Sequence, residues 1–140
     1  MAEPAKTLAG GCLCGAVRYA VTGALRDVVG CHCSQCRRTT GHFLAATAAR
    51  HANFTVVKDS GLKWYQSSPS ARRGFCSQCG STLFWEGRGK PHVSIAAGTL
   101  DDSSGLRTVC HIHVADKGAY YEIEAGVPQS ADGSFCVPLP

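Results

Sequence analysis

The chain has 140 residues, the usual length of one domain, so we expect a single domain over residues 1–140. Charged residues are only 17% of the chain and 16 residues are glycine, which argues against long surface helices. The first residues are polar and no apolar run could cross a bilayer, so we expect a cytoplasmic protein with no membrane partner.

Short apolar or alternating segments bounded by glycine, serine or proline predict seven β-strands. In chain order these are residues 16–21, 43–48, 54–57, 62–66, 83–86, 92–96 and 111–114. Helical character is confined to residues 34–40, which open with Ser34 as a candidate N-cap, and residues 100–106. Proline and small residues predict an extended tail over residues 129–140. The sequence therefore predicts an all-β domain with one or two short helical turns.

Seven of the nine cysteines lie in three tight groups, a pattern typical of metal binding. The groups are Cys12 and Cys14, then Cys31, Cys33 and Cys36, then Cys76 and Cys79. Zinc takes about four ligands at tetrahedral positions, and a C-x2-C turn readily presents two sulfurs to one ion. In a reducing cytosol clustered cysteines bind metal more often than they form disulfides, and an odd count does not suit a disulfide framework. We therefore expect zinc, with two ions per chain.

The spacing leaves open how the seven thiolates divide between two ions. The first pair can combine with the last pair in a closed four-thiolate site, or with two members of the central triplet. Every four-plus-three division leaves one site incomplete. That site is either open to water or substrate, as catalytic zinc sites are, or closed by a further ligand such as a histidine.

The net charge gives little support for a nucleic-acid partner. The formal charge of +4 counts every cysteine as neutral, whereas seven thiolates subtract seven charges and two zinc ions add four, which leaves about +1. Arg37 and Arg38 follow Cys36 directly and could offset the negative charge of three thiolates on zinc. We nevertheless interpret this pair, like the pair formed by Arg72 and Arg73, as a solvated basic turn.

Three ordered motifs carry a family resemblance. They are Gly10-Gly11-Cys12-Leu13-Cys14-Gly15, Cys31-His32-Cys33-Ser34-Gln35-Cys36-Arg37 and Phe75-Cys76-Ser77-Gln78-Cys79-Gly80-Ser81. Over residues 8–128 the chain resembles the glutathione-dependent formaldehyde-activating enzyme family, to which centromere protein V is related. The resemblance implies a Mss4-like fold, in which stacked short antiparallel sheets surround zinc.

The resemblance also implies how the thiolates divide and what the chain does. The implied structural zinc ligands are Cys12, Cys14, Cys76 and Cys79, and the implied catalytic zinc ligands are Cys31, Cys33 and Cys36. The family reaction is that of a carbon–sulfur lyase working in reverse, which joins formaldehyde to the thiol of glutathione and gives S-hydroxymethylglutathione. Glutathione or another small-molecule thiol is therefore the implied partner.

Two alternatives come from other functional classes. One is a non-catalytic interaction module stabilised by zinc, and the other is a thiol-based redox or metal sensor, since an incompletely ligated triplet is open to oxidation. An exchangeable fourth ligand would distinguish the enzyme, whereas reversible zinc release by peroxide would distinguish the sensor.

The histidines receive structural interpretations. His32 lies between two proposed ligands and is expected to face away from the metal, because neighbours in an extended turn point in opposite directions. His111 and His113 are expected to share one face of a strand as a satisfied or solvent-facing pair, and His42 is a candidate for a pocket beside the triplet.

The remaining cysteines and the aromatic residues are also given structural roles. Cys110 and Cys136 lie outside the three motifs and are interpreted as small buried hydrophobic residues. Aromatic side chains in predicted strands are expected to be in the core; these are Phe43, Trp64, Tyr65, Phe84 and Trp85.

Overall fold

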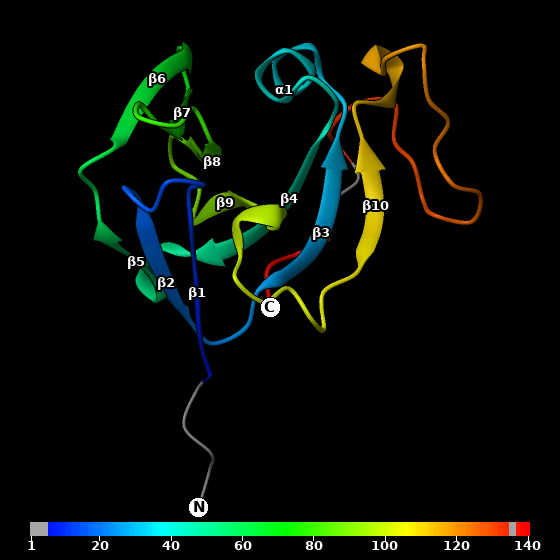
Figure 1. The fold of residues 1–140 in the computed structure, drawn as a ribbon. Helices are drawn as coiled ribbons and strands as arrows, with labels where there is room; N and C mark the ends of the chain where they lie inside the picture. Colours follow the sequence, from blue (N-terminus) through cyan, green and yellow to red (C-terminus); the bar gives the residue numbers. More distant parts are fainter. Residues whose placement is uncertain (1–5, 135–136) are drawn as a thin grey trace, which may run out of the picture.

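The computed structural model describes residues 6–134 and 137–140, and within them the chain is a two-sheet β protein (Figure 1). The smaller sheet has the order β1 (Thr7–Gly11), β2 (Arg18–Thr22), β5 (Phe54–Lys58). The larger sheet has the order β10 (Thr108–Ile112), β3 (Arg26–Cys31), β4 (Leu44–Arg50), β9 (His92–Ala96), β8 (Thr82–Gly87), β7 (Ala71–Cys76), β6 (Leu62–Ser68). Neighbouring strands are antiparallel except β10 and β3, which are parallel. The expected all-β, Mss4-like fold is confirmed.

Three strands of the structure were not predicted, and each lacks a local alternation of apolar and polar residues. The first, β1, ends in two glycines, β3 has three consecutive buried residues, and β7 contains two arginines. Pairing between strands stabilises these segments, because each is hydrogen-bonded to at least one neighbouring strand in its sheet.

The helix predicted at residues 34–40 is present as α1 (Ser34–Thr40), but its N-cap is Cys33 and not Ser34. The Cys33 sulfur accepts the Cys36 backbone N–H, which satisfies one free donor of the first turn. The helix predicted at residues 100–106 is wrong, since this segment consists of turns and bends. Asp102 accepts the backbone N–H of Ser104, and Gly105 has a φ of 87°, which interrupts a helix.

The main core lies between the two sheets. Tyr19 and Val21 of β2 pack with Phe84 of β8 and Ile95 of β9, and all four are 3% exposed or less. The Tyr19 and Phe84 rings meet edge to face with centroids 5.3 Å apart. The expected core position is confirmed for Phe84, whereas Tyr65 is 63% exposed and the core prediction for it is wrong.

Helix α1 is placed between two parts of the larger sheet, at the top of the view in Figure 1. It follows β3 directly and contacts β4. On its other side the Gln35 side-chain amide donates to the Ser67 carbonyl at 3.1 Å, and the Thr82 hydroxyl donates to the Thr39 carbonyl at 3.2 Å. The helix therefore connects the β3–β4 part of the sheet to the β6–β8 part.

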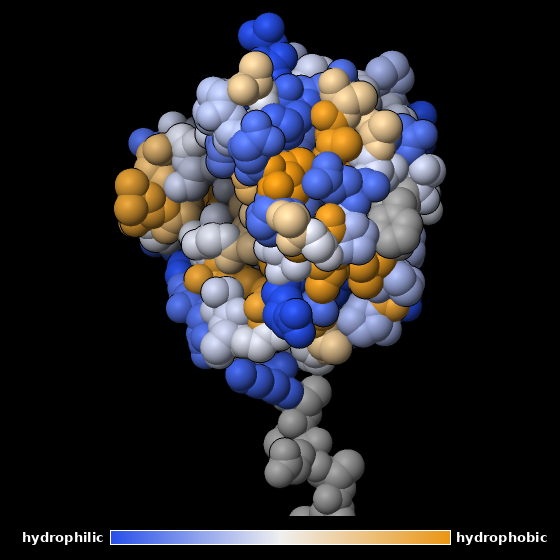
Figure 2. Space-filling model, turned by 90° about the vertical axis from the view of Figure 1, so that its right-hand side faces the viewer, coloured by the Kyte–Doolittle hydropathy of each residue, from blue (hydrophilic) through white to orange (hydrophobic). Residues whose placement is uncertain are grey.

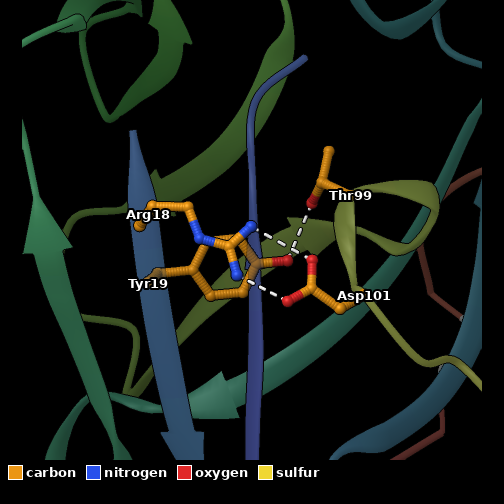
Figure 3. A network of polar contacts seen from close by, with 4 residues as sticks. All are labelled: Arg18, Tyr19, Thr99 and Asp101. Carbon is orange, nitrogen blue, oxygen red and sulfur yellow. Dashed lines mark hydrogen bonds and ion pairs between the residues drawn. The ribbon is translucent and has the colours of Figure 1, made fainter. Parts of the chain in front are cut away.

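Two consecutive residues of β2 connect the smaller sheet to the segment after β9. Arg18 forms an ion pair with Asp101, and the Tyr19 hydroxyl shares a hydrogen bond of 2.8 Å with the Thr99 hydroxyl (Figure 3). Both side chains pack on glycines of β1, where a Cβ at Gly10 would lie 2.4 Å from the Tyr19 oxygen. The absence of side chains at the end of β1 is therefore what allows these contacts.

The surface on the β10 side carries small apolar areas separated by hydrophilic side chains (Figure 2). The segment after β10 lies against that strand, where Gln129 forms a parallel bridge with His111. At the end of the chain the Pro140 carbonyl accepts hydrogen bonds from the Arg50 guanidinium. Of the helices in the described part of the chain, none is long and apolar enough to span a bilayer.

The glycine contacts give a test of how the two sheets are held. We expect Gly10→Ala to lower the free energy of unfolding by about 1–3 kcal/mol, because the new Cβ would overlap the Tyr19 hydroxyl and the Thr99 carbonyl. Gly98→Ala is the control, since a Cβ there meets no heavy atom within 4 Å, and it should change stability by no more than about 0.5 kcal/mol. Urea unfolding at fixed metal concentration measures the free energy of unfolding of both variants. Equal losses of stability in Gly10→Ala and Gly98→Ala would contradict the prediction.

Candidate metal centres

Four of the cysteines come together from two distant parts of the chain. The sulfurs of Cys12, Cys14, Cys76 and Cys79 all lie within 4.8 Å of one another. We call these residues the four-cysteine group. Cys12 and Cys14 follow β1, and Cys76 ends β7, so the group joins the smaller sheet to the larger one. Cys12 and Cys76 are also buried members of the main core.

Similar turns present both pairs of the four-cysteine group. Gly15 and Gly80, each directly after the second cysteine of its pair, have φ angles of 84° and 80°. These left-handed conformations favour glycine, so both glycines allow the tight turns that follow the cysteines. The Gly80 N–H donates to the Cys76 carbonyl at 2.7 Å, and the Gly15 N–H donates to the Cys12 carbonyl at 3.3 Å.

Hydrogen bonds favour the thiolate form of Cys79. The Ser81 hydroxyl, with the backbone N–H groups of Ser81 and Cys14, lowers the pKa of Cys79 to about 5. At Cys12 the sulfur accepts the Val17 N–H at 3.2 Å. Donors of this kind stabilise metal-ligating thiolates, because the ligand form of cysteine is the anion.

The other three motif cysteines form a second group, which we call the triplet. Cys31 is the last residue of β3, Cys33 caps α1, and Cys36 lies within α1. Their sulfurs lie within 4.8 Å of one another, and Cys36 is 3% exposed. Hydrogen bonds from Cys31 and Cys36 lower the pKa of Cys33, whereas the contact with Cys33 raises the pKa of Cys31. A bound cation would displace the protons of these sulfurs, because the metal-ligating form of cysteine is the thiolate.

The sulfur spacing of the four-cysteine group fits a tetrahedral ion. A zinc–sulfur distance of about 2.3 Å separates the sulfurs of a tetrahedral site by about 3.8 Å. The Cys14 sulfur lies 3.7 Å from that of Cys12 and 3.8 Å from that of Cys76. Among the described residues, no histidine nitrogen or carboxylate oxygen joins either group. The structure therefore has one group of four sulfurs and one group of three.

Arg73 departs from the interpretation of the arginine pairs as solvated turns. Both arginines of its pair lie in β7, where Arg72 is exposed and forms an ion pair with Glu86. Arg73 is only 7% exposed, and both of its terminal nitrogens lie 3.6 Å from the Cys36 sulfur. The solvated interpretation is therefore wrong for Arg73, because alternation along the strand turns it toward the triplet.

His32 faces away from the sulfurs, as expected. It is fully buried, one ring nitrogen shares a hydrogen bond with the Tyr121 hydroxyl, and the other lies 2.9 Å from His111 Nδ1. The second ring nitrogen of His111 lies 3.5 Å from a Glu124 carboxylate oxygen. Burial, with the nearby charge of His111, lowers the pKa of His32 to about 4, so the ring is neutral at neutral pH.

Aromatic side chains beside the triplet include two that the sequence did not single out. Phe43 stacks on His32 with ring centroids 4.6 Å apart. Its predicted place within a strand is wrong, because β4 begins one residue later, at Leu44. Tyr121 stacks on the same imidazole at 5.6 Å. His42 hydrogen-bonds to the hydroxyl of Tyr120, which is 66% exposed. These tyrosines lie in an irregular segment after β10, where periodicity carries no signal.

The last candidate residues are two histidines and two cysteines outside the four-cysteine group and the triplet. His111 is 2% exposed in β10, whereas His113 lies beyond the end of that strand with a φ of 54°. The two therefore do not share a strand face, and that expectation is wrong. Cys110 is buried, as expected for a small hydrophobic residue. Cys136 lies outside the described residues.

Comparison with known proteins identifies the family of the chain. The model of the glutathione-dependent formaldehyde-activating enzyme family matches residues 7–116. The chain belongs to this family. A crystal structure of a protein from Rhodobacter sphaeroides is 31% identical, with a TM-score of 0.56, over 71% of this chain and 90% of that one. The family match ends at residue 116, earlier than the expected residue 128. The segment with Tyr120 and Tyr121 therefore lies beyond the match.

This member of the formaldehyde-activating family has a cleft beside the triplet. The cleft has a volume of about 280 Å³ and lies between α1 and the β6–β8 part of the larger sheet. Its lining includes Thr39 of α1, Tyr65 of β6, Arg73 of β7 and Thr82 of β8. Arg73 therefore lies between this cleft and Cys36, because it borders the cleft and contacts the Cys36 sulfur.

The two groups differ in how far apart in the chain their ligands lie, and this predicts unequal effects on stability. Cys14 and Cys76 are 62 positions apart, and closing a loop of that size is worth about 4 kcal/mol, whereas the triplet closes only a short one. With excess Zn²⁺, we expect Cys76→Ala and Cys36→Ala each to lose one ion, and Cys76→Ala to lose several kcal/mol more of unfolding free energy. Elemental analysis and urea unfolding measure the two effects, and an equal loss of stability would contradict the prediction.

Proposed function

We propose that the chain is a zinc-dependent enzyme that adds a small electrophile such as formaldehyde to the thiol of glutathione or a similar thiol. In this proposal Cys12, Cys14, Cys76 and Cys79 hold a structural zinc, and Cys31, Cys33 and Cys36 hold the zinc at which the thiol binds. The reaction class is that of a carbon–sulfur lyase working in reverse. Membership of the formaldehyde-activating family supports this chemistry.

The observation that carries the proposal is the unequal number of sulfurs in the two groups. Four sulfurs complete a tetrahedral ion, and such closed sites are structural, whereas three protein ligands with one open position are typical of catalytic zinc. No described histidine or carboxylate supplies a fourth ligand to the triplet. The sulfur of a substrate thiol has the right chemistry for that position.

The reaction requires a carbon–sulfur bond to form while the thiol loses its proton. The sulfur adds to the carbonyl carbon, the carbonyl π electrons move to oxygen, and that oxygen takes up a proton equivalent to the one that the thiol gave up. Zinc bound by three thiolates would favour the thiolate form of a fourth ligand and hold its sulfur in place. No oxidant or reductant is needed.

The surroundings of the triplet suit a small polar thiol. The cleft beside it is slightly smaller than most ligand sites, and its lining includes Thr39, Tyr65 and Thr82, whose side chains carry hydroxyls. Arg73 adds a positive charge at the border of this cleft, next to Cys36. These groups can orient a peptide-like thiol, which carries carboxylates and amides, through hydrogen bonds.

Cobalt substitution tests the proposed thiol position. In protein loaded with Co²⁺, we expect glutathione to intensify the sulfur-to-cobalt charge-transfer band, since a fourth thiolate joins the triplet centre. Cys36→Ser should bind one ion fewer and lose this response. Cys110→Ala is the matched control, because Cys110 is a buried cysteine that belongs to neither group, and it should retain both ions and the response.

Turnover is measured by exchange spectroscopy at equilibrium, because thiols and formaldehyde combine without an enzyme. The native protein should accelerate exchange between glutathione and its hydroxymethyl adduct at least tenfold over buffer, and Cys36→Ser should return it to the buffer rate. A native protein that binds two ions but neither responds to glutathione nor accelerates exchange would contradict the enzyme and favour a zinc-stabilised interaction module.

A further inference from the structure

The contacts of Arg73, a buried arginine beside the triplet, are unusual. The Nη1 and Nη2 atoms of Arg73 both lie 3.6 Å from the Cys36 sulfur, so the guanidinium faces that sulfur with two donors. Nη2 also donates to the Gln35 side-chain oxygen at 3.4 Å, which orients the guanidinium. The contacts come from β7 to α1, between residues 37 positions apart in the chain.

Arg73 is buried without a carboxylate partner among the described residues, unlike its neighbour Arg72. Arginine is always protonated, and taking its charge out of water costs several kcal/mol unless an anion compensates for it. Arg72 has such an anion in Glu86, at 2.7 Å. No described carboxylate forms an ion pair with Arg73, and its buried Nε has no hydrogen-bond partner among the described residues. The side-chain atoms that face the guanidinium are therefore the Cys36 sulfur and the Gln35 oxygen.

The charges of the triplet complement the charge of this arginine. Three thiolates with one divalent cation carry a net charge of −1, and the guanidinium at hydrogen-bond distance brings the assembly to zero. If a fourth thiolate binds, the net charge becomes −1 with Arg73 and −2 without it. In a partly buried site the second value is costly, because Coulomb repulsion is weakly screened there.

We propose that Arg73 is a positioning residue that orients the Cys36 sulfur, sets the metal affinity of the triplet and offsets the negative charge that an anionic fourth ligand would add. This inference rests on the proposed metal-binding role of the triplet. Residues that hydrogen-bond to metal ligands from outside typically change affinity by about 10- to 100-fold when removed. The two parallel donors distinguish Arg73 from a distant positive charge.

The test measures metal affinity by chelator competition with Zn²⁺ and Co²⁺, in three variants of the full chain. Arg73→Gln removes the charge and the paired donors, and should weaken the triplet ion about 10- to 100-fold while the ion of the four-cysteine group keeps its affinity. Arg73→Lys keeps the charge on a single donor and should lose less than tenfold. Arg72→Gln is the matched control, an exposed neighbour in the same strand, and should stay within about twofold of native.

The cobalt spectrum supplies a readout that a purely structural role would not move. N–H donors draw electron density from sulfur, so their loss in Arg73→Gln should shift the charge-transfer band of the triplet centre to longer wavelength, with partial recovery in Arg73→Lys.

The outcomes separate this inference from the proposed function. Unchanged triplet affinity and an unshifted band in Arg73→Gln, in a protein that still binds two ions, would overturn the role of Arg73 alone. A native chain that binds a single ion would overturn the metal role of the triplet and this inference with it. If Arg73→Gln does not fold, the Arg73→Lys variant is the test. A native metal affinity of the triplet and a native charge-transfer band in Arg73→Lys would overturn the role of the paired donors.

Discussion

The fold depends on the meeting of four cysteines from two strand ends. Cys12 and Cys14 follow β1 of the smaller sheet, and Cys76 and Cys79 lie at and beyond the end of β7 in the larger one. Because Cys12 and Cys76 are also part of the main core, the sulfurs and the apolar side chains hold the same two sheets together. The cross-links on the other side of β1, from Arg18 and Tyr19 to the segment after β9, have the same effect. A small domain with short strands gains most from cross-links of this kind, since its core alone is modest.

The triplet is built differently from the four-cysteine group. All three sulfurs come from one short stretch at the end of β3 and the start of α1, so a bound ion there adds little to the closure of the chain. Side chains from distant elements surround this stretch: Arg73 of β7 contacts Cys36, and His111 of β10 and Tyr121 of the segment beyond contact His32. These contacts orient the stretch, and no described histidine or carboxylate joins its three sulfurs.

The local features of this chain could be predicted from its sequence, and the long-range features could not. The range of α1 was predicted correctly, because a short segment of the sequence carries its signal. Strand β7 was missed because Arg72 and Arg73 look like a solvated turn. The partner that allows Arg73 to be buried is a sulfur 37 positions away, and no local pattern reveals it. Tyr121 was missed as a neighbour of His32 for the same reason, since 89 positions separate the two residues.

Strand β7 connects the two centres, and this connection has a physical consequence. Arg73 contacts the triplet from the middle of the strand, and Cys76 enters the four-cysteine group from its end. The backbone between them is confined, because a Cβ at Gly74 would lie 3.0 Å from Phe84 and 3.1 Å from Trp64. A strand packed this closely transmits a displacement of its end rather than absorbing it. An ion in the four-cysteine group would therefore also restrict the distance between the Arg73 guanidinium and the Cys36 sulfur, which would couple the two groups.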